Sequence, residues 1–331
     1  MRMLPVLPVL AALALLAGCG VDPAQPPRPP AAEPSDAPTQ LGEPAGRVIP
    51  IGPLAEGMVA DPVTSAVAIG VREPPALLLV DGRTGEELTR TPLPGFLRHL
   101  QLEAPGGPVL VPAESADELV RVDLPAGRVV TRVPVGDFPH DATATPGGTI
   151  VVANEFGGTV SVVRGGRVVH TFDDATQPGG LAPVGEQVGM VDVREGTLTL
   201  YDTERLERVG RLPAGDGPTH VIADRRGELI VTDTRGGALI RYAVAPTLRE
   251  IGRTTLPGGP YGIAYDAVRD RLWITLTGRN ELVGLDLGRG GPREAVRLPT
   301  VRQPNTVAVD SSTGRVFVGG TADGVLQLVD P

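Results

Sequence analysis

Histidine, carboxylate and other polar side chains recur at one place in a repeat of roughly 42 residues, at the start of its first β run. In five of the seven repeats they directly follow a proline. Three of the four histidines occur there. Imidazole suits Zn²⁺ and Cu²⁺, and carboxylate suits Ca²⁺ and Mn²⁺. If the fold brings these positions together, they can hold a divalent metal or a small polar ligand. The paired positions are Glu56-Gly57, Arg98-His99, His140-Asp141, Gly179-Gly180, Thr219-His220, Tyr261-Gly262 and Asn305-Thr306.

The elements that must position these residues are short β-strands. The repeat at 217–259 predicts strands at 219–223, 228–232, 238–242 and 249–255. Between them, Arg225-Arg226-Gly227 and Arg235-Gly236-Gly237 have the composition of tight turns between antiparallel strands. One four-stranded unit per repeat, with almost no helical pattern, predicts an all-β fold, a seven-bladed β-propeller.

The first and last repeats predict how the ring closes. We place the blades at 54–95, 96–137, 138–176, 177–216, 217–259, 260–303 and 304–331. The last blade lacks a fourth strand, whereas Arg47-Val48-Ile49-Pro50-Ile51 is a strand without a blade. An open ring would leave two unpaired sheet edges. We therefore expect residues 46–52 to form the outer strand of the last blade, in a propeller domain that spans 46–331.

The inner strands of a propeller line a central channel, so the residues that open them meet at one rim. No catalytic residue and no cofactor is assigned, and a divalent metal is left open. The alternative is that a wet channel mouth accumulates polar residues without any function. The candidate ligand-binding residues are Glu56, Arg98, His99, His140, Asp141, His220, Tyr261 and Asn305, and the candidate metal ligands are Glu56, His99, His140 and His220.

The N-terminus has the pattern of a secretory signal, with Arg2 followed by an apolar stretch and small residues. Leu16-Ala17-Gly18-Cys19, which holds the only cysteine, resembles the bacterial lipobox. That resemblance implies a signal peptide at 1–19 and acylation of Cys19, hence a partner in the lipid bilayer and an extracytoplasmic location. Residue 20 is glycine and not the aspartate that retains lipoproteins in the inner membrane. The outer membrane is therefore an alternative location in a two-membrane cell. An ordinary signal peptide with an incidental cysteine is the other interpretation.

Composition limits the remaining functions. Residues 20–45 are rich in Pro and Ala without an apolar period, which predicts a disordered tether. The formal charge of −9, without a Lys/Arg cluster, disfavours nucleic acid as a partner. Aromatic residues make up only 3%, which argues against stacking platforms for sugars or bases. We expect a monomer.

The segment at 151–163, Val-Val-Ala-Asn-Glu-Phe-Gly-Gly-Thr-Val-Ser-Val-Val, resembles the repeat of YVTN-type β-propellers. Looser copies occur at 229–233 and 315–319, and the resemblance extends over about 46–331. It implies the propeller fold and membership of a group made up largely of binding scaffolds and envelope proteins. We therefore expect a membrane-anchored module that binds an envelope protein or a small polar ligand at the channel rim.

Two further resemblances favour an alternative function. Leu54-Ala55-Glu56-Gly57 with Asp61-Pro62 is similar to the opening of gluconolactonase-type propellers, in which the Glu is a metal ligand. Pro260-Tyr261-Gly262-Ile263-Ala264 is similar to a phrase of streptogramin lyases. The alternative is therefore a metal-dependent hydrolase or lyase that uses the same funnel, although the order of the other motifs departs from both families.

Overall fold

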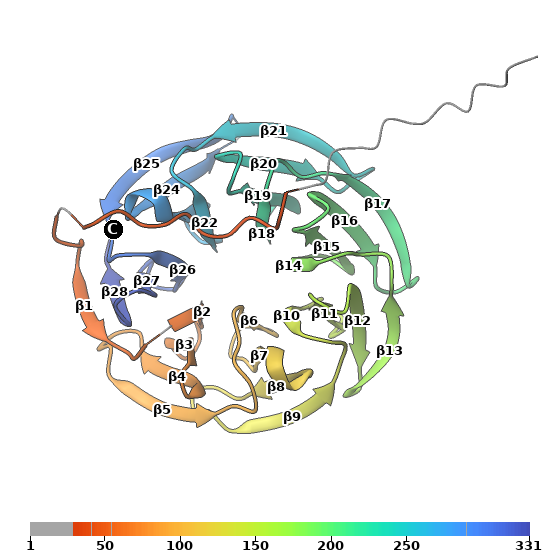
Figure 1. Ribbon diagram of the computed structural model, residues 1–331, viewed down its shortest axis with the longest axis horizontal. Coiled ribbons are helices and arrows are strands. Elements are labelled where there is room, and N and C mark those ends of the chain that lie inside the picture. The colour runs from red at the N-terminus through yellow and green to blue at the C-terminus, as the bar shows by residue number, and fades with distance from the viewer. Residues whose placement is uncertain (1–28, 41, 54, 289) are drawn as a thin grey trace, which may run out of the picture.

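The short apolar runs and their Gly-, Asp- and Asn-containing turns form seven four-stranded antiparallel sheets arranged in a ring (Figure 1). The computed structural model describes residues 29–40, 42–53, 55–288 and 290–331. The expected signal peptide with Cys19, residues 20–28 of the expected tether, and Leu54 lie outside the described residues. Within them, no helix is long and apolar enough to cross a bilayer. The predicted seven-bladed propeller is confirmed.

The blades are numbered in chain order of their inner strands. Blade 1 holds β2 (Ala55–Ala60), β3 (Ala66–Arg72), β4 (Pro75–Asp81) and β5 (Glu87–Pro92). Blade 2 holds β6 (Gln101–Leu102), β7 (Val109–Ala113), β8 (Glu118–Val122) and β9 (Val129–Pro134), with the 3₁₀ turn η1 (Glu114–Ala116). Blade 3 holds β10 (Pro139–Ala144), β11 (Ile150–Asn154), β12 (Thr159–Arg164) and β13 (Arg167–Phe172). Blade 4 holds β14 (Pro178–Val184), β15 (Gln187–Asp192), β16 (Thr197–Asp202) and β17 (Glu207–Pro213).

The last three blades follow the same plan. Blade 5 holds β18 (Pro218–Ala223), β19 (Glu228–Asp233), β20 (Ala238–Ala243) and β21 (Arg249–Thr255). Blade 6 holds β22 (Pro260–Asp266), β23 (Arg271–Leu276), β24 (Glu281–Gly288) and β25 (Gly291–Pro299), with the 3₁₀ turn η2 (Thr277–Arg279). Blade 7 holds β26 (Pro304–Val309), β27 (Val316–Gly320), β28 (Val325–Val329) and, as its outer strand, β1 (Arg47–Pro50).

The ring is closed by the N-terminal strand, as the sequence predicts. β1 pairs antiparallel with β28, with Arg47 opposite Leu328 and Ile49 opposite Leu326. The sheet order of blade 7 is β1-β28-β27-β26, so one blade combines the two ends of the domain. Ile49 also packs against the core between blades 7 and 1. The closure therefore rests on both ladder hydrogen bonds and apolar contact.

The hydrophobic core lies between neighbouring blades. The second and third strands of each blade are almost fully buried, whereas the outermost strands such as β13 are mostly exposed. Val191 of blade 4 and Val231 of blade 5, for example, belong to one buried cluster. Each fully buried Val, Leu or Ile contributes about 1.5–3 kcal/mol relative to exposure. The interblade packing thus gives a rigid wall around the channel.

A backbone irregularity places the candidate residues at the channel. In six blades the register of the inner strand shifts directly after its first residues, for example between Pro139 and Asp141 and between Pro304 and Thr306. Such a bulge frees a residue from the ladder and turns its side chain. The residues after the proline therefore lie outside the regular pairing, where they can face the channel.

Residues 29–40 differ from the disordered tether that the sequence predicts. They run as an extended segment across one face of the ring, over blades 4 to 7 (Figure 1). Arg235 Nη2 donates to Pro30 O at 2.7 Å, and Asn280 Nδ2 donates to Pro38 O at 2.9 Å. The side chain of Gln303 accepts from Ala37 N at 2.9 Å and donates to Ser35 O at 3.1 Å. We call residues 29–40 the strap.

Candidate ligand-binding site in the channel

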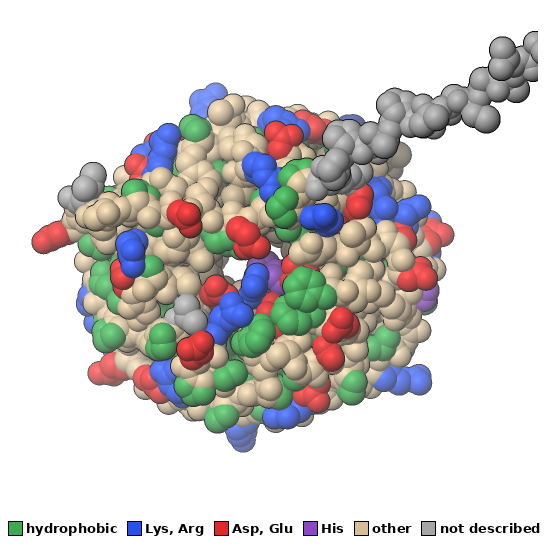
Figure 2. All heavy atoms as spheres, viewed as in Figure 1, with side chains coloured by type: hydrophobic (Ala, Val, Ile, Leu, Met, Phe, Trp, Pro, Cys, Tyr) green, Lys and Arg blue, Asp and Glu red, His purple; other side chains and the backbone are tan. Residues whose placement is uncertain are grey.

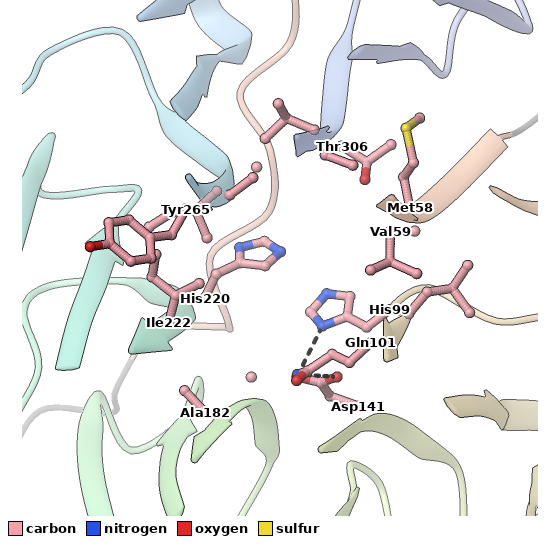
Figure 3. A pocket seen from close by; sticks show the side chains of 18 of the residues that line it. Met58, Val59, His99, Gln101, Asp141, Ala182, His220, Ile222, Tyr265 and Thr306 are labelled. Carbon is pink, nitrogen blue, oxygen red and sulfur yellow. Dashed lines mark hydrogen bonds and ion pairs between the residues drawn. The ribbon is translucent and has the colours of Figure 1, made fainter. Parts of the chain in front are cut away.

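The channel contains a cavity of about 580 Å³ to which the inner strands of all seven blades contribute. Met58, Val59, Ala182 and Ile222 form apolar parts of its wall (Figure 3). Seven of the eight predicted ligand-binding residues line it: Glu56, Arg98, His99, Asp141, His220, Tyr261 and Asn305. The eighth, His140, lies against His99. The rim alignment made from the sequence therefore identifies residues that do converge.

Three histidines from different blades pack against one another at this cavity, and we call His99, His140 and His220 the histidine stack. The rings of His99 and His220 are stacked, with centroids 4.7 Å apart and an angle of 19°, whereas the ring of His140 is tilted by 53° to that of His99, with centroids 4.5 Å apart. Tyr261 packs edge-on against His220 at 4.5 Å. Burial, together with repulsion from His99 and His140, holds the pKa of His220 well below its usual value. His220 is therefore neutral near pH 7, and its buried Nδ1 has no hydrogen-bond partner among the described residues.

Asp141 is a fixed carboxylate beside His99 in the cavity wall. Gln101 Nε2 donates to both of its oxygens at 3.1 Å, and the backbone N–H of Leu181 donates to Oδ2 at 2.8 Å (Figure 3). Gln101 is itself oriented by Thr143, whose hydroxyl donates to Gln101 Oε1 at 2.7 Å. His99 Nδ1 lies 3.6 Å from Asp141 Oδ2. A carboxylate beside one ring nitrogen orients the imidazole, as in acid–base pairs.

His140 lies between two buried carboxylates. Its Nδ1 is 3.0 Å from Glu114 Oε1 and 3.0 Å from Glu155 Oε2. Burial alone would lower the pKa of His140, but hydrogen bonds to Glu114 and Glu155 and their charges outweigh it and raise the pKa from 6.5 to about 10. Burial likewise opposes the ionisation of Glu155, yet the hydrogen bond and charge of His140 lower the pKa of this carboxyl to about 2. With no metal bound, His140 is a cation and not a free base at neutral pH.

Glu114 and Glu155 were not among the sequence-based candidates, although the repeat contains a signal for them. Both occupy the position after the second strand, where the backbone N–H donates to the carbonyl just before the inner strand, at Phe96 and Phe138. In blades 5, 6 and 7 the same backbone bond is made by a threonine. Those threonine hydroxyls donate to backbone carbonyls beside the inner strands: Thr234 to Pro260, Thr277 to Gly259 and Thr321 to Ala55. A glutamate at the position after the second strand therefore differs from the threonine that blades 5, 6 and 7 carry.

Glu56 is held by arginines instead of joining the histidines. Arg72 Nη1 donates to Glu56 Oε2 at 2.9 Å, and Arg98 Nε lies 3.9 Å from the same oxygen. Arg98 Nε is also 3.9 Å from Glu114 Oε1. Burial opposes the charge of Arg98, but Glu114 and Glu56 outweigh it and raise the pKa of the guanidinium.

The predicted metal set of Glu56, His99, His140 and His220 is therefore wrong as a single centre. Glu56 is paired with Arg72 and Arg98. Among the described residues, the group whose ligand atoms all lie within 4.8 Å of one another is Glu114, His140 and Glu155. Only His140 is common to the two sets.

The strap and an aromatic group flank the mouth of the channel. Glu33 and Pro34 of the strap contribute to the cavity wall. Phe138 lies 5.9 Å from Phe96 and 4.4 Å from Phe156 between ring centroids. Phe156 is 61% exposed. Figure 2 shows hydrophobic and charged side chains of both signs gathered around the opening of this face. The mouth thus offers apolar contact and charge to an entering molecule.

Comparison with known proteins supports the fold and does not supply a function. No family model and no curated protein matches the sequence. Hydrazine synthase of Kuenenia stuttgartiensis is similar in structure with a TM-score of 0.73 at 16% identity, over 84% of this chain and 96% of that chain. Virginiamycin B lyase from Staphylococcus aureus gives 0.70 at 15% identity, over 87% and 100%. A streptogramin B lyase gives 0.71 at 14% identity, over 86% and 96%.

Proposed function

We propose that this protein is a membrane-anchored, extracytoplasmic binding module of the YVTN-repeat type whose channel holds a small polar ligand. The observation that carries the proposal is the histidine stack at the cavity. His220 is neutral, and its buried Nδ1 lacks a partner among the described residues, which costs free energy unless a ligand or water satisfies it. Asp141 is held in place at the same cavity by Gln101. Groups fixed in this way favour binding of one defined molecule.

The cavity restricts the class of ligand. A volume of about 580 Å³ lies in the range of sites for drug-sized molecules. Its wall combines imidazole, carboxylate and phenol groups with the apolar side chains of Met58, Val59 and Ile222. A molecule with a polar end that donates and accepts hydrogen bonds, and an apolar remainder, satisfies both parts. An envelope protein that inserts one side chain into the mouth is the alternative partner.

The anchor is proposed from the sequence around Cys19. Acylation of Cys19 would supply the lipid chains, and two such chains already give stable membrane attachment. Replacing Cys19 with alanine is therefore expected to move the mature protein from the membrane fraction to the soluble fraction, as measured by fractionation and immunoblotting. A Cys19→Ala protein that stays in the membrane fraction after a high-salt wash would show that Cys19 is not the anchor.

The second candidate is a metal-dependent hydrolase or lyase, and one observation favours it. His99 Nδ1 lies 3.6 Å from Asp141 Oδ2, which leaves the other ring nitrogen available for proton transfer. The similarity to lyase structures adds only the shared fold. An enzyme would convert the molecule that it binds into a chemically different product, whereas a binding module would release it unchanged.

Thermal unfolding of the full-length protein in detergent tests the binding function. Addition of the small-molecule fraction of an envelope extract is expected to raise Tm by several degrees, because a ligand at 100 times its Kd stabilises by about 2.7 kcal/mol. His220→Phe should abolish the shift. His170→Phe, on the outer strand β13, is the matched control and should keep it. An equal shift in both variants, or none in the native protein, would refute a channel ligand.

A further inference from the structure

Glu114, His140 and Glu155 bring one ligand atom each to a common point from two neighbouring blades. Glu114 begins η1 after the second strand of blade 2, His140 is the bulged residue of β10, and Glu155 follows β11. These atoms all lie within 4.8 Å of one another. Glu114 is 0%, Glu155 6% and His140 8% exposed. We propose that these three residues form a divalent-cation site beside the channel cavity, independent of the identity of the channel ligand.

An unsatisfied buried oxygen points to a missing cation. Glu114 is completely buried, and its Oε2 has no hydrogen-bond partner among the described residues. Arg98 does not supply one, because its Nε stays 3.9 Å from the other oxygen of Glu114. A buried carboxylate without full compensation is costly. A metal ion at this point would complete the coordination of the carboxylate.

The repeat provides an independent reason. The position of Glu114 and Glu155 holds threonine in blades 5, 6 and 7, where the hydroxyl binds a backbone carbonyl. A ring of similar blades can be built with threonine there. Blade 4 has a valine there, Val193. The two blades with an acidic residue at this position are adjacent, and both carboxylates meet at His140. Two carboxylates and an imidazole at one point serve metal binding better than they serve packing.

The donor set indicates the class of metal. Two carboxylate oxygens and one imidazole nitrogen suit divalent ions such as Mn²⁺ and Zn²⁺, and three protein ligands leave positions open for water or a ligand. Binding replaces the Nδ1 proton of His140, which passes to solvent. The ion and two carboxylates then balance in charge with a neutral imidazole. Gln177 Nε2 donates to Glu155 Oε1 at 2.7 Å and would orient that ligand.

Calorimetric titration of the chelator-treated, full-length protein with MnCl₂ and with ZnCl₂ tests the site. We expect one ion per chain and release of about one proton, measured as a dependence of the heat on the ionisation enthalpy of the buffer. The isosteric variants Glu114→Gln and Glu155→Gln should each weaken binding at least about tenfold. Glu118→Gln, in β8 of the same blade, is the matched control and should bind like the native protein.

Either of two results would overturn the proposal: neither ion binds saturably, or both glutamine variants bind as tightly as the native protein. If one variant does not fold, the other variant still decides. The result is separate from the ligand proposal, because the thermal shift with envelope extract is measured with chelator present. If metal binding is lost while the thermal shift with the extract is kept, the metal proposal fails and the channel-ligand proposal is unaffected.

Discussion

Replacing His140 with threonine is expected to lower the free energy of unfolding by about 3–5 kcal/mol when divalent ions are absent. The substitution removes the cation that lies 3.0 Å from both Glu114 and Glu155 and leaves two buried carboxylates facing each other. Threonine is the residue at the equivalent place in blade 5, Thr219, so the backbone tolerates it. The midpoint and slope of urea unfolding, with a chelator present, measure the effect.

The triple replacement Glu114→Thr, His140→Thr and Glu155→Thr is expected to recover most of this loss. It removes all three buried charged groups together and gives each glutamate position the residue that blades 5, 6 and 7 carry. Replacing a whole buried ion network is often neutral or stabilising, whereas breaking it is costly. Recovery would show that the propeller does not need this ion network for its stability. A triple variant as unstable as the sum of its single variants would contradict this.

The loss caused by His140→Thr should also depend on pH. Because the pKa of His140 rises from 6.5 to about 10 in the fold, its contribution is complete below pH 6.5 and is lost as pH rises toward 10. Because the pKa of Glu155 falls from 4.5 to about 2, its contribution is complete above pH 4.5 and is lost toward pH 2. The difference from the native protein should therefore be largest between pH 4.5 and 6.5. A difference that stays constant into the alkaline range would contradict the ion network.

Gly46→Ala is expected to open the ring at its closure and to lower stability by at least about 2 kcal/mol. Gly46 has a φ of 75°, which favours glycine, and an added Cβ would lie 2.1 Å from Leu328 O. That oxygen belongs to the backbone of β28, so β1 must move away from its partner strand. Urea unfolding, and faster amide exchange in β28, measure the loss of the closing strand.

Gly42→Ala is the matched control for the closure. An added Cβ at Gly42 meets nothing within 4 Å, so this variant should unfold like the native protein. If Gly46→Ala were equally stable and its β28 amides equally protected, the pairing of β1 with β28 would not be what closes the ring. Increased aggregation of Gly46→Ala is a second expected sign, since an unpaired β28 exposes a sheet edge.

The fold was predictable because its determinants are local and repeated. The prolines before the inner strands and the glycines of the turns recur with the blade, so their spacing identifies each four-stranded unit. The closing strand followed from counting strands: blade 7 had one too few, and Val48 and Ile49 lay in a strand with no blade. The alignment on proline likewise identified residues that line the cavity, such as His220 and Tyr261.

The metal-ligand set and the strap were not predictable in the same way, because they depend on tertiary contacts. Glu56 is drawn into pairs with Arg72 and Arg98, which no repeat spacing indicates. Glu114 and Glu155 directly follow the second strands of their blades, whereas the aligned prolines mark the first strands. The strap is held largely through its backbone carbonyls, as in the bond from Arg235 to Pro30 O. The side chains of the strap therefore give little sequence signal for these contacts.

The native mass spectrum of the full-length protein, gently extracted in detergent from the cells that make it, tests most directly whether the channel is a binding site. The structure predicts one small molecule bound per chain, released unchanged on denaturation and absent from His220→Phe. The His170→Phe protein should retain it. Bare protein from the native preparation, or the same bound molecule on His220→Phe, would contradict a ligand site at the histidine stack.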